Sequence, residues 1–114
     1  MTKLIIDVQK VEKIAFDNPL GFTINLVDLS PLKTGIVSAY AATQNAFGKA
    51  GLMRALSHAY HHERILGGWM DKKSGHYFYD SCKVFESLEE ALKFGREQRQ
   101  IAIYDLDNDK VIFC

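Results

Sequence analysis

Aromatic and acidic side chains gather in one short segment of the chain, residues 67–80. This segment holds the only tryptophan, Trp69. Tryptophan and tyrosine are favoured anchors in binding sites because they bury a large area with little loss of side-chain entropy. The segment therefore predicts a surface that holds a partner or a ligand. The members that we expect from this segment are Trp69, Asp71, His76, Tyr79 and Asp80.

The same aromatic residues also fit a packing role. Alternate side chains of a strand share a face, so Tyr77 and Tyr79 point to one side. Phe78 and Asp80 point to the other side. One of the two faces packs on a helix, and large aromatic residues are common in cores. The alternative to a binding surface is therefore that Trp69 and the two tyrosines are core or cross-strand packing residues.

Two amide side chains, Gln44 and Asn45, lie just before a predicted helix. Amides at a junction between a strand and a helix can hydrogen-bond to a ligand, a base edge or a sugar. The same residues are also ordinary turn and cap residues, and Asn45 is a suitable N-cap. We include Gln44 and Asn45 in the expected binding surface.

Metal binding has little support in this sequence. His58 and His62 are four residues apart, a spacing that can place two imidazoles on one metal ion. No glutamate follows His58 as in H-E-x-x-H, and no third ligand is evident. We expect solvated histidines at the end of a helix, and neither a metal nor a cofactor.

Catalytic motifs are equally sparse. Cys82 and His76 are six residues apart on one predicted strand, which separates them by about 20 Å. No nucleophile elbow or phosphate-binding glycine loop occurs. One set of side chains could act on a scissile phosphate without a metal, namely His76, Lys83, Arg96 and Tyr79. We assign no catalytic residue, and an enzyme is the less favoured interpretation.

Composition predicts a single globular domain, residues 1–114, with 47% hydrophobic and 25% charged residues. Fourteen basic and fourteen acidic residues give a formal net charge of zero, which gives no strong signal for nucleic-acid binding. Two isolated cysteines favour a reducing compartment. There is no signal peptide and no apolar run of eighteen residues, so we expect a cytoplasmic protein without a membrane segment.

Hydrophobic patterning predicts an α+β fold with a mainly antiparallel sheet and two helices. The expected order is roughly β-β-β-α-β-β-α-β-β. The expected strands are residues 10–16 (a weaker strand or edge), 22–26, 35–42, 66–70, 76–84, 101–106 and 110–113. The expected helices are residues 46–63, with an apolar stripe at helical spacing, and a second one after Ser87, where Ser87 and Glu90 form a capping box.

Several motifs in the chain resemble small domains carried by phages and conjugative elements of gut bacteria. The motifs are Gly67-Gly68-Trp69-Met70-Asp71, Gly75-His76-Tyr77-Phe78-Tyr79-Asp80 and Gln100-Ile101-Ala102-Ile103-Tyr104-Asp105-Leu106. Two further segments, Asp17-Asn18-Pro19-Leu20-Gly21-Phe22-Thr23 and Thr43-Gln44-Asn45-Ala46-Phe47-Gly48, extend the resemblance over most of the chain.

The resemblance implies a small accessory protein in the cytoplasm of a bacterial host cell. Such a protein acts by binding, for example by inhibiting or sequestering a host defence component. Its partner is then a host or phage protein, with a small-molecule ligand as the other option. The alternative is a diverged metal-independent ribonuclease of the barnase, EndoU and RelE-like group. A third interpretation is a structural module that forms a homodimer through exposed hairpin edges.

Overall fold

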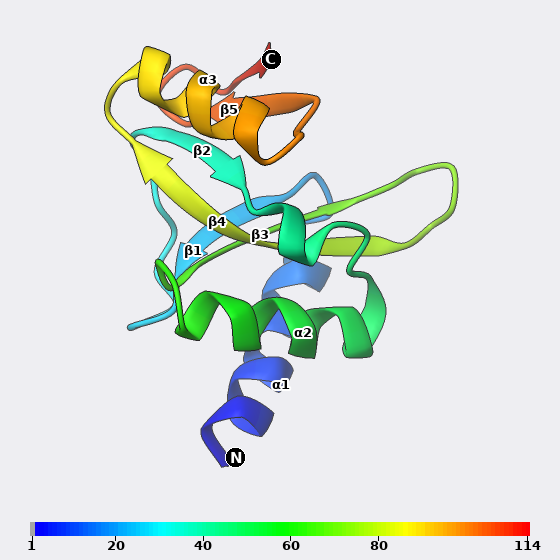
Figure 1. Cartoon of the computed structure of the whole chain (residues 1–114). Helices are drawn as coiled ribbons and strands as arrows, with labels where there is room; N and C mark the ends of the chain where they lie inside the picture. Colours follow the sequence, from blue (N-terminus) through cyan, green and yellow to red (C-terminus); the bar gives the residue numbers. More distant parts are fainter. Residues whose placement is uncertain (1) are drawn as a thin grey trace.

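The computed structural model describes residues 2–114, which form three α-helices, a short 3-10 helix and six strands. The fold is α+β with a mainly antiparallel sheet, as the sequence predicts (Figure 1). In chain order the elements are α1 (Thr2–Asp17), β1 (Phe22–Asn25), β2 (Ile36–Ala39), η1 (Ala41–Thr43), α2 (Gly48–Tyr60), β3 (Ile65–Met70), β4 (Tyr77–Phe85), α3 (Leu88–Glu97), β5 (Ala102–Asp105) and β6 (Lys110–Phe113).

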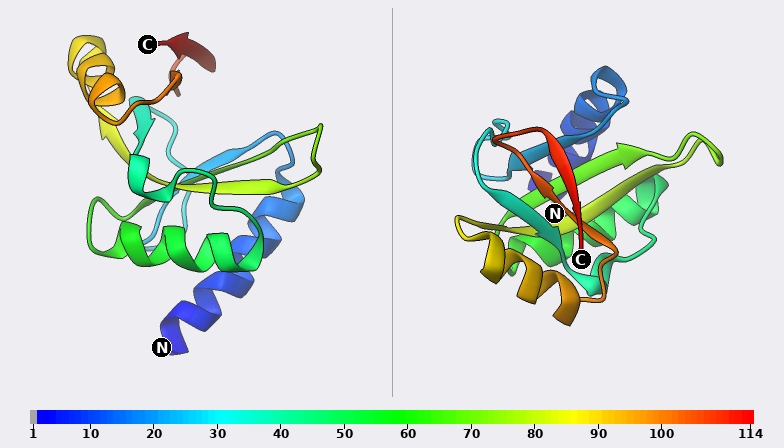
Figure 2. Two further views of the ribbon diagram at one scale, coloured as in Figure 1. Left: turned by 45° about the vertical axis from the view of Figure 1, so that its right-hand side comes forward. Right: turned by 90° about the horizontal axis from the view of Figure 1, so that it is seen from above.

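All six strands belong to one sheet with the order β1-β3-β4-β2-β5-β6, and every pair is antiparallel. β3 and β4 form a long hairpin whose tip projects beyond the helices in both views of Figure 2. The register places Trp69 opposite Phe78 and Gly67 opposite Asp80. The hairpin thus puts an aromatic pair next to an acid, with no side chain directly across from that acid.

The core is divided into two clusters along the sheet. α1 and α2 lie under β1, β3 and β4, whereas α3 packs at the other end against β2 and β5 (Figure 1). The larger cluster buries apolar side chains of α1, α2, these three strands and the turn after β1: Val8, Val11, Ala15, Ile24, Leu26, Leu52, Ala55, Leu56, Ala59, Leu66 and Tyr79. The smaller cluster is Ile36, Ala91 and Ile103. The larger cluster therefore packs the β3–β4 hairpin against α2.

The first element differs from the sequence-based expectation. The sequence pattern predicts a strand or edge over residues 10–16, but these residues lie inside α1. The β-branched residues of this segment favour a strand locally, yet Val8, Val11 and Ala15 follow helical spacing and all three are buried. Burial of this apolar stripe against α2 therefore outweighs local propensity. The helix count is three, not two.

The other expected helices and strands form with shifted bounds, except that residues 41 and 42, expected at the end of the strand over residues 35–42, belong to the 3-10 helix η1. α3 begins as predicted, because the Ser87 hydroxyl oxygen accepts a hydrogen bond of 3.3 Å from the Glu90 amide. The two predicted hairpins form as β3–β4 and β5–β6. Within residues 2–114, no helix combines the length and the apolar character that crossing a membrane requires.

The start of α2 corrects the expected role of Asn45. The N-cap of this helix is Phe47, which has no capping side chain, and Asn45 lies two residues further upstream. Asn45 has a φ of 61°, a left-handed conformation that asparagine tolerates better than most residues. Asn45 is therefore a turn residue, and its side chain is not used to cap the helix.

Candidate functional site

A pocket of about 300 Å³ opens beside the β3–β4 hairpin. It combines acids, amides and aromatic rings, and no lysine or arginine lines it. The lining residues are Gln44, Asn45, Trp69, Asp71, Phe78, Asp80 and Gln100. Five of these seven residues belong to the binding surface that the sequence predicts. We call this hollow the Asp80 pocket.

The hairpin forms the aromatic wall of the Asp80 pocket. Trp69 and Phe78 are partners across the two strands, and their rings stack with centroids 5.3 Å apart and an interplanar angle of 23°. The Trp69 side chain is 48% exposed, so one face of this stack is open to a binding partner. Trp69 therefore lies at the rim and outside the core, and it also makes the cross-strand packing contact that the alternative interpretation expects.

A loop on the opposite edge of β4 forms the amide wall of the Asp80 pocket. The Tyr40 amide donates to the Ser81 carbonyl at 2.9 Å, and the Tyr79 amide donates to the Ala46 carbonyl at 2.8 Å. These two bonds flank a single residue of β4, Asp80. The segment that pairs with β4 here has five residues, 41–45, between its two bonded residues, Tyr40 and Ala46. The extra residues loop out of the sheet edge next to Asp80 and include Gln44 and Asn45.

Hydrogen bonds hold this loop in place. The buried Thr43 hydroxyl accepts from the Ser81 amide at 3.0 Å, and Arg54 of α2 donates to the Gln44 carbonyl at 2.8 Å. The side chain of Gln100 donates to the side-chain oxygen of Gln44 at 3.3 Å. The amide wall is thus fixed from β4, from α2 and from the segment after α3, as a preorganised site requires.

Asp80 is the most unusual group of the pocket. Burial raises the pKa of its carboxyl group to about 6. Among residues 2–114, no protein group donates a hydrogen bond to this carboxylate, and no basic side chain pairs with it. The neighbouring Cys82 is buried, and burial raises the pKa of its thiol, so it stays neutral. Desolvated acids in pockets are typical of functional sites.

Asp71 adds a second negative charge but also has a structural role. Its carboxylate accepts hydrogen bonds from the Ser74 hydroxyl at 2.8 Å and from the Lys73 amide at 3.3 Å. The bond from Ser74 is the main cause that lowers the pKa of Asp71, so this group is ionised at neutral pH. Asp71 therefore both orders the turn of the hairpin and makes the pocket more negative.

Two predicted members of the surface lie outside the Asp80 pocket. Tyr79 is only 4% exposed and belongs to the larger core cluster, so its placement on a binding surface is wrong. The alternation of the strand explains this, because Tyr79 shares a face with Tyr77 and not with Asp80. His76 is exposed and stacks on Phe47 with ring centroids 4.2 Å apart, next to the pocket and not within it.

Phe78 and Gln100 line the Asp80 pocket but were missing from the predicted surface. For Phe78 a signal was present, because it shares the strand face of Asp80 and sits across from Trp69. For Gln100 the sequence carries no signal. It reaches Gln44 across 56 positions of the chain, a proximity that only the folded sheet creates.

His58 of α2 and His62, which follows this helix, both have partners within the protein. Their rings are parallel at 3.7 Å, the His58 ring nitrogen lies 2.7 Å from the Ser81 hydroxyl, and the ring of Tyr40 packs on both. Burial is the main cause that lowers the pKa of His58. Within residues 2–114, no cluster of three or more potential metal ligands occurs.

The side chains of the ribonuclease alternative do not assemble around one point. Tyr79 is in the core, and the Lys83 ammonium lies over the rings of Phe85 and Phe94, 5.5 and 5.6 Å from their centroids. His76 instead stacks on the ring of Phe47, just before the start of β4, whereas Lys83 lies near the end of this strand. This arrangement does not place an acid and a base on either side of a scissile phosphate.

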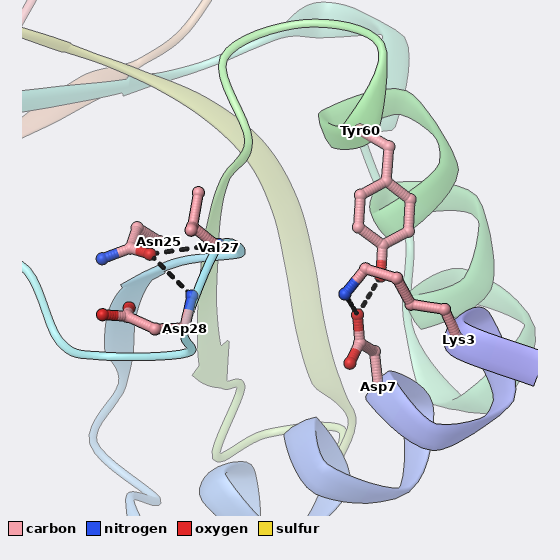
Figure 3. A network of polar contacts seen from close by, with 6 residues as sticks. All are labelled: Lys3, Asp7, Asn25, Val27, Asp28 and Tyr60. Carbon is pink, nitrogen blue, oxygen red and sulfur yellow. Dashed lines mark hydrogen bonds and ion pairs between the residues drawn. The ribbon is translucent and has the colours of Figure 1, made fainter.

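A second, larger hollow of about 590 Å³ lies where α1 meets the end of α2. Beside it, the buried carboxylate of Asp7 accepts a hydrogen bond from the Tyr60 hydroxyl and pairs with the Lys3 ammonium at 3.1 Å (Figure 3). The lining is Lys3, Leu4, Leu26, Val27, Tyr60, His61 and Arg64. The acid at this hollow is thus satisfied by its own chain, in contrast to Asp80.

Both hollows are lined by residues of this one chain. No protein-family model, curated protein or solved structure matches the chain, so its chemistry is inferred from its own residues.

Proposed function

We propose that this protein acts by binding a protein partner through the Asp80 pocket, as an accessory factor of a phage or other mobile element. The observation that carries this proposal is the convergence of three separate segments on one pocket with an exposed tryptophan at its rim. Hot spots of protein interfaces have this composition, with an aromatic anchor beside fixed polar groups.

The surroundings of the pocket favour a protein over a small molecule. Phe47, Phe78 and Trp69 form a row of aromatic rings, with successive centroids 5.7 and 5.3 Å apart. Phe47 is 45% exposed, so the apolar surface continues past the pocket. A row of this length suits a partner that covers both the pocket and its aromatic border.

Inhibition or sequestration of a host defence component agrees with this geometry. Occupying the surface of another protein requires a rigid contact face and no catalytic groups. The resemblance to small domains of phages and conjugative elements supports the same role. The neutral net charge fits a protein partner better than a nucleic acid, whose backbone normally demands an excess of basic residues.

A capture experiment with a single substitution tests the proposal. Tagged protein is incubated with lysate of the bacterial host, and bound proteins are identified and quantified by mass spectrometry. Trp69→Ala should weaken retention of the partner about thirtyfold or more, the usual effect of losing an aromatic hot spot. Asp71 is left intact because its removal would also loosen the hairpin turn.

The matched control is Phe16→Ala, which removes an aromatic side chain that is 86% exposed on α1, outside the pocket. It should leave retention unchanged. Urea unfolding of both variants checks that each is folded. A partner held equally by wild-type protein and by folded Trp69→Ala would overturn the proposed function.

A further inference from the structure

The Asp80 pocket offers the chemistry of a cation site that its own chain does not fill. Asp80 and Asp71 supply two carboxylates, and none of the seven lining residues is basic. Taking a carboxylate out of water is unfavourable unless a donor or a cation compensates it. The Asp80 carboxylate receives no hydrogen bond from any residue in 2–114. A positively charged group from another molecule would supply that compensation.

The shape of the pocket favours a planar cation. The stacked rings of Trp69 and Phe78 line the pocket together with Asp80, and Trp69 is half-exposed. A guanidinium group is planar, stacks on aromatic faces and donates two parallel hydrogen bonds to one carboxylate. An ammonium group is compact and more strongly hydrated, so it gains less from such a wall.

The amide wall adds acceptors for the remaining donors of a guanidinium group. Gln100 uses its amide nitrogen to bond Gln44 and the Gln98 carbonyl, which leaves its side-chain oxygen as an acceptor. The neighbouring Asn45 contributes a further amide group to the lining. Five N–H donors need several acceptors in a fixed arrangement, and this wall is fixed by hydrogen bonds.

We propose that the Asp80 pocket receives the guanidinium group of an arginine side chain presented by the partner protein. This inference rests on the proposed function and names the group that the pocket recognises. A pocket of about 300 Å³ suits one side chain rather than a whole cofactor. A nucleotide is disfavoured because no lysine or arginine lines the pocket to meet its phosphates.

The test uses the only tryptophan as a reporter, since Trp69 lies at the rim of the pocket. The probe is N-acetyl-arginine methylamide, and its binding is followed by Trp69 fluorescence at constant ionic strength. The citrulline and lysine analogues are the matched ligands, because citrulline is neutral and planar whereas lysine is charged and not planar. The arginine probe should bind saturably, at least about tenfold more tightly than citrulline and more tightly than lysine.

The variant Asp80→Asn should weaken binding of the arginine probe about tenfold, because it removes the charge and keeps the size of the side chain. Asp109→Asn is the matched control, with the same change of charge in the exposed turn between β5 and β6, and should bind like wild-type protein. Equal binding of arginine and citrulline, or an arginine affinity that Asp80→Asn leaves unchanged, would overturn the inference.

Guanosine is titrated in parallel, because a guanine base can also stack on Trp69 and donate to a carboxylate. Tighter binding of guanosine than of the arginine probe, lost in Asp80→Asn, would replace the inference with a nucleobase site. Failure of all probes together with Trp69-dependent capture of a partner would refute the arginine site and leave the binding function standing. Arginine binding without Trp69-dependent capture would refute the binding function alone.

Discussion

Asp7 and Asp80 are two acids withdrawn from water that differ in what compensates them. Asp7 is 5% exposed. Its carboxylate accepts a hydrogen bond from the Tyr60 hydroxyl and forms an ion pair with the Lys3 ammonium (Figure 3). Asp80 is partly buried in the lining of a pocket, and no residue among 2–114 donates a hydrogen bond to its carboxylate. A buried polar group normally has partners. The comparison separates a carboxylate that joins two helices from one that is placed to meet another molecule.

The secondary structure around each acid explains the difference. Asp7 lies on α1, so Lys3 is one turn away, and Tyr60 reaches across from the end of α2. Asp80 lies on a strand whose facing residue is Gly67, and the loop beside it presents neutral amides. The same substitution at the two positions should therefore change stability in opposite directions.

Asp7→Asn tests the structural half of the comparison and should have the largest effect. The change removes a charge-assisted hydrogen bond from Tyr60 and the ion pair with Lys3 in a buried place. We expect the free energy of unfolding to fall by about 2 kcal/mol, measured by urea denaturation at pH 7.5. An unchanged value would show that Asp7 does not join the two helices.

Asp80→Asn tests the other half and should increase the free energy of unfolding at pH 7.5 by about 1 to 2 kcal/mol. The charged form of Asp80 is disfavoured by burial in the folded state, as its pKa of about 6 indicates. The full shift would correspond to about 3 kcal/mol, and partial exposure reduces it. Asp109→Asn, the exposed control, should change stability by less than about 0.5 kcal/mol. A loss of stability in Asp80→Asn would contradict the comparison.

The pH dependence sharpens this result. The pKa of Asp80 is higher in the folded state than the ordinary value of 3.8, so the folded state binds more protons between about pH 4 and pH 6. Its contribution to stability is therefore fully present below pH 4 and is lost as the pH rises through about 6. The advantage of Asp80→Asn over wild-type protein should vanish at pH 4 and reach its full size above pH 7.

Neighbouring groups do not account for a transition in this range. The pKa of Asp71 is lowered, mainly by the hydrogen bond from Ser74, so Asp71 titrates below Asp80, and burial raises the pKa of the Cys82 thiol, which stays neutral. Urea denaturation at pH 4, 5, 6, 7 and 8 measures the difference between the two proteins. A difference that is constant over this range would show that Asp80 is not desolvated.

Lys3→Ala should have the smallest effect of the series. The Lys3 side chain is 67% exposed, and exposed ion pairs contribute little. We expect a decrease in the free energy of unfolding below about 0.5 kcal/mol, because Tyr60 still donates to Asp7. A decrease as large as that of Asp7→Asn would assign the structural role to the ion pair and not to the hydrogen bond.

Local patterns in the sequence were sufficient for most elements. The capping box at Ser87 predicts the start of α3, and turn residues predict both hairpins. Residues 10–16 of α1 favour a strand locally because Val11 and Ile14 are β-branched, although the spacing of the buried Val8, Val11 and Ala15 is helical. The deciding contact is with α2, a distant part of the chain, so local propensity could not reveal it.

For the candidate site too, local sequence patterns predict some features, and contacts between distant segments decide the others. Alternation along β4 correctly separates Tyr79 from Asp80, but it does not say which face meets the helices. A surface that includes both Tyr79 and Asp80 contradicts this alternation, because successive residues of a strand point to opposite faces. Gln100 enters the pocket, and Asp80 becomes partly desolvated, only because distant segments of the chain converge.

The most direct test of the central claim is the pKa of Asp80 itself, measured by NMR of its carboxyl carbon with and without the arginine probe. A titration midpoint near pH 6 in the free protein should move downward with the probe, because a cation favours the charged form. A midpoint near 4 in the free protein, or one that the probe leaves unchanged, would contradict a carboxylate placed to receive a guanidinium group.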